Sequence, residues 1–499
     1  MSASLPGLRR LCASAVLMGL PCLAVAQKDP PKPVTLSAPT PTAASAELAG
    51  MPAPLKDQQD AAIAKLLLQV SPTHVRATIE KLVSFGTRIT TGPADADTVA
   101  RGRGIGAARE WIKSEFQRYS DACGGCLEVK TDVFTEQPGG RIPAPTELMN
   151  VYAVMKGTAP EAAKHIVLVT GHYDSIPSAK DWPNFGTDAP GANDDASGSA
   201  VSLECARVLS QGKFPGTIIF LTVAGEEQGL NGSRHFAKMA KDQNWLIDAA
   251  LNNDIVGGDR TPGQDTSIVR VFSEGIPQPD LKDERAVGSV RSLGAENDSP
   301  SRDLARYIRE AGATYLSDIF QPMMVYRPDR YLRGGDHTSF NQQGYAAVRF
   351  TEYRENYNHQ HQTVRTENGI EYGDLPKFVD FDYVANVARM NAATLASLAS
   401  APSAPNNVRI VTRRLENDTM LAWDAAPRAI EYEVVWRPTT SPDWVGVEKA
   451  GNVTTITLPR SKDNVIFGVR AVDTAGHRSL VVIPKPDRSP TPAAMSTER

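Results

Sequence analysis

Short apolar runs that alternate with helical stretches between residues 56 and 400 constrain the fold of this chain more than any other feature. Residues 166–170 and 217–223 are strand-length runs rich in β-branched residues, and residues 196–209 between them have a helical pattern. Strand–helix–strand alternation favours a mostly parallel central sheet with helices on both faces. The sequence therefore predicts an α/β domain over residues 56–400.

The composition changes at residues 401–407, a cluster rich in Pro, Ser and Asn. Short alternating strands are expected beyond it, at residues 408–411, 419–423, 432–436, 454–458 and 465–472. They predict a separate all-β sandwich over residues 401–490, followed by a disordered tail at 491–499. Trp423, residues 431–436 and residues 467–479 resemble a fibronectin type III domain, which implies binding to a surface or polymer, or a spacer.

The N-terminus has the order of a secretory signal peptide. Arg9 and Arg10 precede an apolar run at residues 13–25, and small residues lead to an expected cleavage after Ala26. About 13 apolar residues are too few to span roughly 30 Å of hydrocarbon, so we expect no stable membrane insertion. We predict a signal peptide at residues 1–26, a secreted or periplasmic protein, and a Pro/Ala-rich linker or pro-segment at 27–55.

Charge and cysteine content restrict the remaining classes. The formal net charge of −4 is spread along all 499 residues, so nucleic-acid binding is not expected. After signal removal, three cysteines remain, and the spacing of Cys123 and Cys126 suits a redox motif, half a metal site or a local disulfide. An oxidising compartment favours the disulfide, whereas Cys205 is expected to lie in a helix core.

Metal-capable side chains stand just beyond the apolar strands, where an open α/β sheet gathers its ligand site. His172 follows the run 166–170, with Asp174 two residues further on, and a carboxylate behind an imidazole is common at zinc sites. Asp194 and Asp195 precede the helix at residue 196. Helix capping explains one of these aspartates, and Asp194 is placed to bridge two cations.

Two adjacent glutamates, Glu226 and Glu227, follow the run 217–223, which is expected to be buried. Two ionised carboxylates at that position are energetically unfavourable without a bound cation. Glu227 suits a metal ligand and Glu226 suits a general base. Asp254 ends another apolar segment, and either His359 or His361 can complete the set. Two histidines and three carboxylates suit a pair of divalent cations, with zinc as the leading candidate.

Together these motifs resemble the bimetallic zinc aminopeptidase family, which includes secreted bacterial leucine aminopeptidases, aminopeptidase Y, glutamate carboxypeptidase and glutaminyl cyclases. The resemblance covers roughly residues 75–400, with five motifs in the family's order. It implies that His172 and Asp254 hold one zinc ion and that Glu227 and a C-terminal histidine hold the other. Asp194 then bridges the two ions, Glu226 is the general base, and Asp174 supports His172.

The family usually follows its last ligand with Thr, two variable residues and an Asp-Thr pair. After His361 only the final threonine, Thr366, is kept, because Gln362 occupies the position of the first Thr and Arg365 that of the Asp. This register favours His361 over His359 as the last ligand. The resemblance also implies that Asp336 and His337 shape the substrate pocket. Tyr331 and Tyr357 are candidates for stabilising the tetrahedral intermediate.

The resemblance implies an aminopeptidase that hydrolyses the N-terminal residues of peptide or protein substrates with two zinc ions per catalytic domain. Three alternatives stay open. One is a carboxypeptidase or other amidohydrolase, in which Arg330, Arg333 or Arg354 holds a C-terminal carboxylate. The others are a glutaminyl cyclase with a single zinc ion and a catalytically silent binding protein with the same fold.

Overall fold

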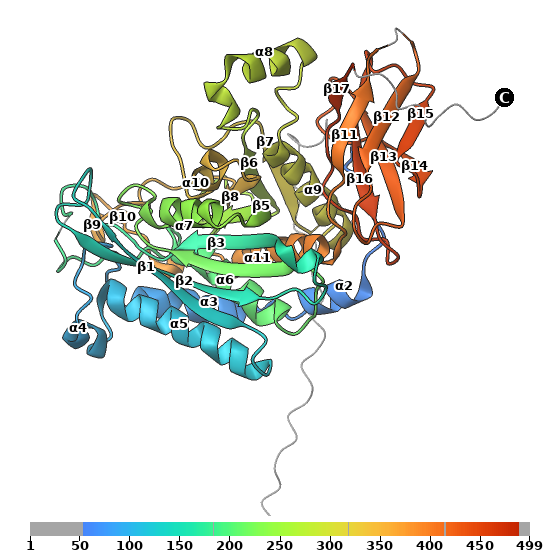
Figure 1. Cartoon of the computed structure of the whole chain (residues 1–499). Helices are drawn as coiled ribbons and strands as arrows, with labels where there is room; N and C mark the ends of the chain where they lie inside the picture. Colours follow the sequence, from blue (N-terminus) through green and yellow to red (C-terminus); the bar gives the residue numbers. More distant parts are fainter. Residues whose placement is uncertain (1–52, 183, 318, 414–415, 489–499) are drawn as a thin grey trace, which may run out of the picture. The chain divides into compact units, whose positions relative to one another are not determined.

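The computed structural model describes residues 53–182, 184–317, 319–413 and 416–488 (Figure 1). The predicted signal peptide (1–26), the predicted tail (491–499) and nearly all of the predicted linker (27–55) lie outside these residues. Among the described helices, none combines the length and apolar character that a membrane crossing requires.

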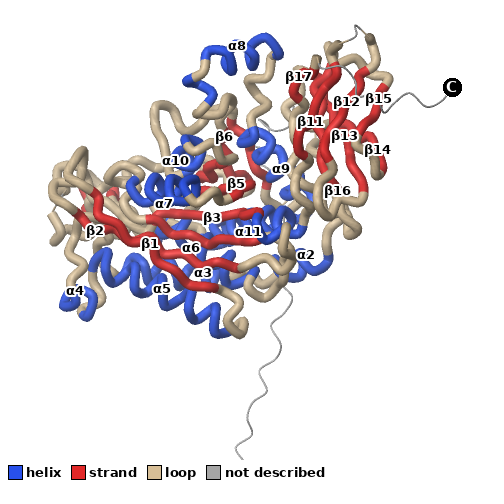
Figure 2. The backbone as a smooth tube through the Cα atoms, in the orientation of Figure 1, coloured by secondary structure: helices blue, strands red, loops and turns tan. Residues whose placement is uncertain are grey.

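An eight-stranded sheet with the order β1-β2-β4-β3-β5-β8-β6-β7 forms the centre of the α/β part (Figures 1 and 2). Its strands are β1 (Glu128–Glu136), β2 (Thr146–Met155), β3 (His165–His172), β4 (Thr217–Val223), β5 (Leu246–Asn253), β6 (Ile268–Ser273), β7 (Gln321–Val325) and β8 (Ala347–Glu352). The neighbours β4, β3, β5 and β8 are parallel, whereas β2 and β6 pair antiparallel with β4 and β8. The predicted mostly parallel sheet is confirmed, with its antiparallel pairs on either side of the parallel centre.

Helices cover both faces of this sheet, as predicted. The helices are α2 (Ala61–Leu67), α3 (Pro72–Ser84), α4 (Ala96–Ala100), α5 (Gly104–Ala122), α6 (Ala196–Leu209), α7 (Asn231–Asp242), α8 (Glu284–Leu293), α9 (Pro300–Tyr315), α10 (His337–Gln342) and α11 (Phe381–Ser400), with short 3₁₀ turns at Ala162–Lys164, Asp280–Lys282 and Pro376–Phe378. One apolar layer contains α3, α5, α6, α9 and α11, and the other contains α7 and α10. Strand β3 supplies Val167 and Val169 to the first layer and Ile166 and Leu168 to the second, because neighbouring strand residues point to opposite faces.

The three cysteines in the described residues occupy the places that the sequence predicted. Cys123 and Cys126 form a disulfide in the turn between α5 and β1, so the prediction of a local clip is confirmed. Cys205 is buried in α6, where it packs in the apolar layer.

The C-terminal residues form two small β-sheets, which we call the C-terminal β module (Asn406–Asp487). One sheet has the order β15-β12-β11-β17 and the other β14-β13-β16. The strands are β11 (Asn406–Val411), β12 (Thr419–Asp424), β13 (Glu431–Pro438), β14 (Gly446–Gly451), β15 (Thr455–Leu458), β16 (Val465–Val472) and β17 (Lys485–Asp487), and a separate hairpin of β9 (Arg365–Glu367) and β10 (Ile370–Tyr372) precedes them. Strands β14 and β17 were not expected, because β14 is bounded by glycines with two charged residues in its middle, and β17 has only three residues.

Buried ion pairs join the C-terminal β module to α9. Arg470 on β16 lies 2.7 Å from Glu310 on α9 and 2.8 Å from Glu433 on β13. Arg437 on β13 forms an ion pair with Asp298, directly before α9. The module is therefore packed against the α/β part through charged groups that are shielded from solvent.

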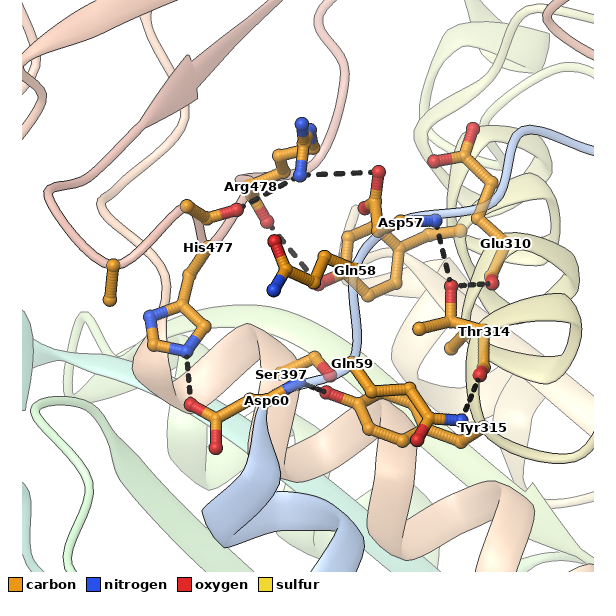
Figure 3. Close-up of a pocket in the computed structure, with 14 residues that line it drawn as sticks. Asp57, Gln58, Gln59, Asp60, Glu310, Thr314, Tyr315, Ser397, His477 and Arg478 are labelled. Carbon is orange, nitrogen blue, oxygen red and sulfur yellow. Dashed lines mark hydrogen bonds and ion pairs between the residues drawn. The ribbon is translucent and has the colours of Figure 1, made fainter.

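The chain that precedes α2 lies between α9 and the C-terminal β module, beside a cavity of about 260 Å³ (Figure 3). Asp57 Oδ1 lies 3.1 Å from Arg478 Nη1, and Asp60 Oδ2 lies 2.9 Å from His477 Nε2. The backbone N–H of Asp57 also donates to the hydroxyl of Thr314 on α9. Residues 57–60 therefore contact both neighbouring parts of the fold.

Candidate metal centre

The carboxyl ends of the parallel strands bring the predicted motif residues to one edge of the sheet. His172 ends β3, Glu226 and Glu227 follow β4, and Asp254 directly follows β5. Parallel neighbours end at the same edge, so side chains that are far apart in sequence become neighbours there. The expected position of the site, beyond the strand ends, is therefore the observed one.

Two groups of metal-capable side chains form at this edge. The first is His172, Glu226 and Asp254, and the second is Asp194, Glu227 and His361, with the ligand atoms within each group no more than 4.8 Å apart. Asp194 lies between the histidines, with Oδ1 3.1 Å from His172 Nε2 and Oδ2 2.9 Å from His361 Nε2. Glu227 Oε1 lies 3.0 Å from His361 Nε2, and Asp254 Oδ1 lies 3.9 Å from His172 Nε2. The structure thus brings together all five predicted ligands and the predicted base.

The donor set fits divalent cations. Burial raises the pKa of Glu226 and of Glu227, because a low-dielectric environment disfavours their charged forms. Four carboxylates, three of them buried, lie in these two groups with only two imidazoles, so bound positive charge would stabilise the ionised state. Nitrogen and oxygen donors without a cysteine also match catalytic zinc sites better than closed structural ones.

Asp174 lies behind His172, as predicted. Its Oδ1 is 3.4 Å from His172 Nδ1, and its Oδ2 accepts a hydrogen bond from the Thr90 hydroxyl at 2.8 Å. The backbone N–H groups of Glu226 and Glu227 also donate to this carboxylate, at 3.3 and 3.2 Å. Asp174 therefore positions both the imidazole and the turn that carries the two glutamates.

The adjacent aspartates before α6 have different roles, as the sequence indicated. Asp195 is the N-cap of α6 and accepts the backbone N–H of Gly198 at 2.8 Å. It also accepts the backbone N–H of His172 at 3.0 Å, which ties the helix start to the end of β3. Asp194, in contrast, points its carboxylate between the two histidines.

The structure distinguishes the two candidate C-terminal histidines. His361 faces Asp194 and Glu227, whereas His359 hydrogen-bonds Asp259 and stacks on Phe378 with ring centroids 3.7 Å apart. His361 also has a φ of 53°, a left-handed backbone conformation that is uncommon for a residue with a side chain. The preference for His361 over His359 agrees with this geometry.

We predict that the two histidines differ in their effect on metal content. His361→Ala should lower bound zinc to about half of the wild-type amount, because it removes a nitrogen donor from one of the two groups. His359→Ala should keep the wild-type zinc content, since its ring contacts Asp259 and Phe378. Elemental analysis of dialysed proteins measures both, and full zinc in His361→Ala would contradict the assignment.

Asp336 and His337 are buried at the start of α10. Burial raises the pKa of Asp336 to about 7, and His337 Nε2 lies 2.6 Å from the carbonyl oxygen of Pro328. Tyr331 and Tyr357 are instead largely exposed. The roles of these four residues in substrate binding stay predictions.

Several side chains that contact the predicted ligands were not expected from the sequence. Arg349 on β8 is fully buried, with Nη1 2.8 Å from Asp254 Oδ2. Asp374 accepts the backbone N–H of Asp194 at 2.7 Å, and Gln360 donates to Asp194 Oδ2 at 3.0 Å. An arginine inside the apolar strand β8 was an available signal, because a buried guanidinium requires a carboxylate partner.

This chain is similar to several known proteins. The family model for "Peptidase family M28" matches residues 150–379. A "Probable zinc metalloprotease" of Pyrenophora teres f. teres is 44% identical over 442 residues, covering 87% of this chain and 88% of the relative. Another from Pyricularia oryzae is 43% identical over 437 residues, covering 86% and 85%. Both relatives are fungal, so a relation to bacterial enzymes in particular is not supported by them.

Solved structures are also similar. The Legionella pneumophila LapA aminopeptidase has a TM-score of 0.48 and 19% identity, covering 71% of this chain and 79% of that chain. BSAP, a zinc aminopeptidase from Bacillus subtilis, has a TM-score of 0.46 and 15% identity, covering 65% and 94%.

Proposed function

Because this chain belongs to peptidase family M28 and is a zinc metallopeptidase, we propose that it acts as an aminopeptidase with two zinc ions. The observation that carries this proposal is the position of Asp194 between His172 and His361, with Glu226 near His172 and Asp254. A carboxylate shared between two donor groups and a neighbouring base is the arrangement that two-metal amide hydrolysis requires.

His172 and Asp254 would hold one zinc ion, Glu227 and His361 the other, and Asp194 both. When bound, the zinc ions supply Lewis-acid activation of water and of the scissile carbonyl. Asp174 holds His172 and the glutamate turn in place for this ligand set. Arg349 holds Asp254 through an ion pair to its second carboxylate oxygen.

Glu226 moves the proton in this mechanism. Its carboxylate accepts a proton from the attacking water and returns it to the leaving amine. Burial raises the pKa of Glu226, which favours proton acceptance. The nearby carboxylates Asp254 and Asp336 raise this pKa further in the same direction.

We predict that hydrolysis requires a free N-terminal amine. The full chain should hydrolyse free aminoacyl anilides and leave the corresponding N-acetylated anilides uncut, because an exopeptidase site receives the charged terminus of its substrate. Release of the aniline chromophore measures both reactions. Hydrolysis of peptides from a free C-terminus with no anilide release would replace this proposal by a carboxypeptidase function.

We also propose that the protein is secreted after cleavage at Ala26 and that residues 401–490 form a fibronectin type III-like domain. The order of charged, apolar and small residues at the N-terminus supports export. Two packed sheets around Trp423, Tyr432 and Phe467 support the second proposal.

A further inference from the structure

The loop between β7 and α10, residues 326–336, passes directly against the metal centre. The carbonyl oxygen of Gly334 accepts a hydrogen bond at 3.1 Å from the Arg349 guanidinium that contacts Asp254. A Cβ atom added to Gly335 would lie 3.4 Å from Asp254 Oδ2 and 2.5 Å from Arg349 Nη1. This close approach places Arg333, two residues before Gly335, near the ligand set.

Arg330 and Arg333 in this loop have different surroundings. Arg330 is buried and lies 2.8 Å from Glu355 Oε2, and Arg270 lies 2.9 Å from the other oxygen, Glu355 Oε1. Both oxygens of Glu355 are therefore already paired. Arg333 Nη1 lies 4.0 Å from Glu355, and its side chain is 35% exposed.

Arg333 is also close to the open side of the site. Its Nη1 is 3.5 Å from Gln360 Oε1, and Gln360 donates in turn to Asp194. The next residue, His361, is 37% exposed at its side chain, so solvent reaches the centre on this side. One amide side chain thus separates the Arg333 guanidinium from the carboxylate that lies between the two histidines.

The backbone holds this arginine in a defined position. The N–H of Arg333 donates to the carbonyl oxygen of Arg330 at 3.0 Å, which closes a turn. Leu332 within the turn has a φ of 59° and is 93% exposed. A left-handed leucine that packs against little is strained, and such strain is common where a loop presents a functional side chain.

We propose that Arg333 binds a carboxylate of the substrate, on the leaving-group side of the scissile bond. A guanidinium forms two parallel hydrogen bonds with a carboxylate and is well suited to this recognition. The carboxylates around Glu226 would repel a substrate carboxylate, so a neighbouring cation is needed to hold one. This inference rests on the proposed aminopeptidase function and adds a substrate class, namely short peptides or peptides with an acidic second residue.

The test uses the zinc-loaded full chain and the variants Arg333→Gln, Arg333→Lys and Arg76→Gln. Arg76→Gln is the control, because it removes the same charge from an exposed arginine on α3 that pairs with Glu80. A dipeptide is compared with its C-terminal amide to test the α-carboxylate. Two dipeptide amides that differ by Glu or Gln at the second position test an acidic side chain, and the aminoacyl anilide has no carboxylate.

Arg333→Gln should lower kcat/KM for carboxylate-bearing substrates on the order of 10- to 100-fold, mainly through KM, and change anilide hydrolysis less than about twofold. Arg333→Lys should recover part of the loss, and Arg76→Gln should behave like the wild type. The substrate pair in which kcat/KM falls selectively identifies the bound carboxylate, either the C-terminal α-carboxylate or the acidic side chain at the second position. Equal losses on all substrates, or no loss on any, would overturn the proposal.

A failure of the proposed function gives a different result. If the wild type cleaves no substrate with a free amine, the aminopeptidase proposal fails. N-acetylated peptides with a free C-terminus then replace the dipeptides, dipeptide amides and anilide as substrates. A selective loss in Arg333→Gln on those peptides would still support carboxylate binding by Arg333. Equal turnover by both proteins on those peptides would overturn it.

Discussion

Replacing Glu226 by Gln is expected to lower kcat by about 10²- to 10⁴-fold while the zinc content stays at the wild-type value. Glutamine has the shape of glutamate but cannot accept a proton. The chemical step is lost, whereas the two histidines and the shared aspartate still provide their donors. Anilide turnover and elemental analysis on the same sample measure both quantities.

Glu227→Gln is the matched control for this experiment, because the two glutamates are adjacent in one turn and differ in their contacts. Glu227 Oε1 lies 3.0 Å from His361 Nε2, within the second donor group, so its substitution should lower zinc content as well as activity. Wild-type turnover in Glu226→Gln would exclude the general-base role. Loss of zinc in that variant would instead make Glu226 a metal ligand, which its distance to His172 and Asp254 allows.

Replacing Arg470 by Met is expected to lower the free energy of unfolding by about 3–5 kcal/mol. Arg470 is buried between Glu310 and Glu433, and its removal leaves Glu310 without a compensating charge in a desolvated position. Burial raises the pKa of Glu310 to about 7 even with Arg470 beside it. Urea-induced unfolding of the full chain, followed by tryptophan fluorescence, measures the change.

The effect of Arg470→Met on the free energy of unfolding should depend on pH in a defined direction. The folded-state pKa of Glu310 is about 7, above the ordinary value of 4.5, so the folded state binds the proton more tightly than the unfolded state. The stability contribution of Glu310 therefore falls as pH rises from about 4.5 to 7. The loss caused by Arg470→Met should be larger at pH 8 than at pH 5, because Glu310 is protonated at the lower pH.

Two further variants test the interpretation. The double variant Glu310→Leu/Arg470→Met should be more stable than Arg470→Met alone, since no unpaired charge is left at position 310. Arg76→Ala breaks an exposed ion pair to Glu80, in which the side chains are 61% and 46% exposed, and should change stability by about 0–1 kcal/mol. A similarly small change in Arg470→Met would show that the C-terminal β module contributes little through this contact.

Local sequence patterns predicted the strands and helices that carry the site. The expected ranges 217–223 and 196–209 coincide with β4 and α6, because a continuous buried strand and a capped helix have strong local signals. Strand β14 was missed because its glycines and charges show no apolar alternation, although it pairs with the preceding strand β13. The roles of Asp194 and Asp195 could be separated in advance, since one N-cap needs only one carboxylate.

The sequence by itself predicted the place of the donor residues beyond the strand ends, because parallel strands bring their carboxyl ends to one edge, and the family resemblance then favoured His361 over His359 as the last donor. The sequence did not show which arginine is available to bind a substrate carboxylate. Arg330 pairs with Glu355 and Arg349 pairs with Asp254, and each of these pairs joins segments that lie apart in the sequence. The burial of Arg470 against α9 is likewise a product of packing between the two parts. The strength of these ion pairs depends on how far their charged groups are removed from water and on the distance between them. Only the tertiary structure decides both.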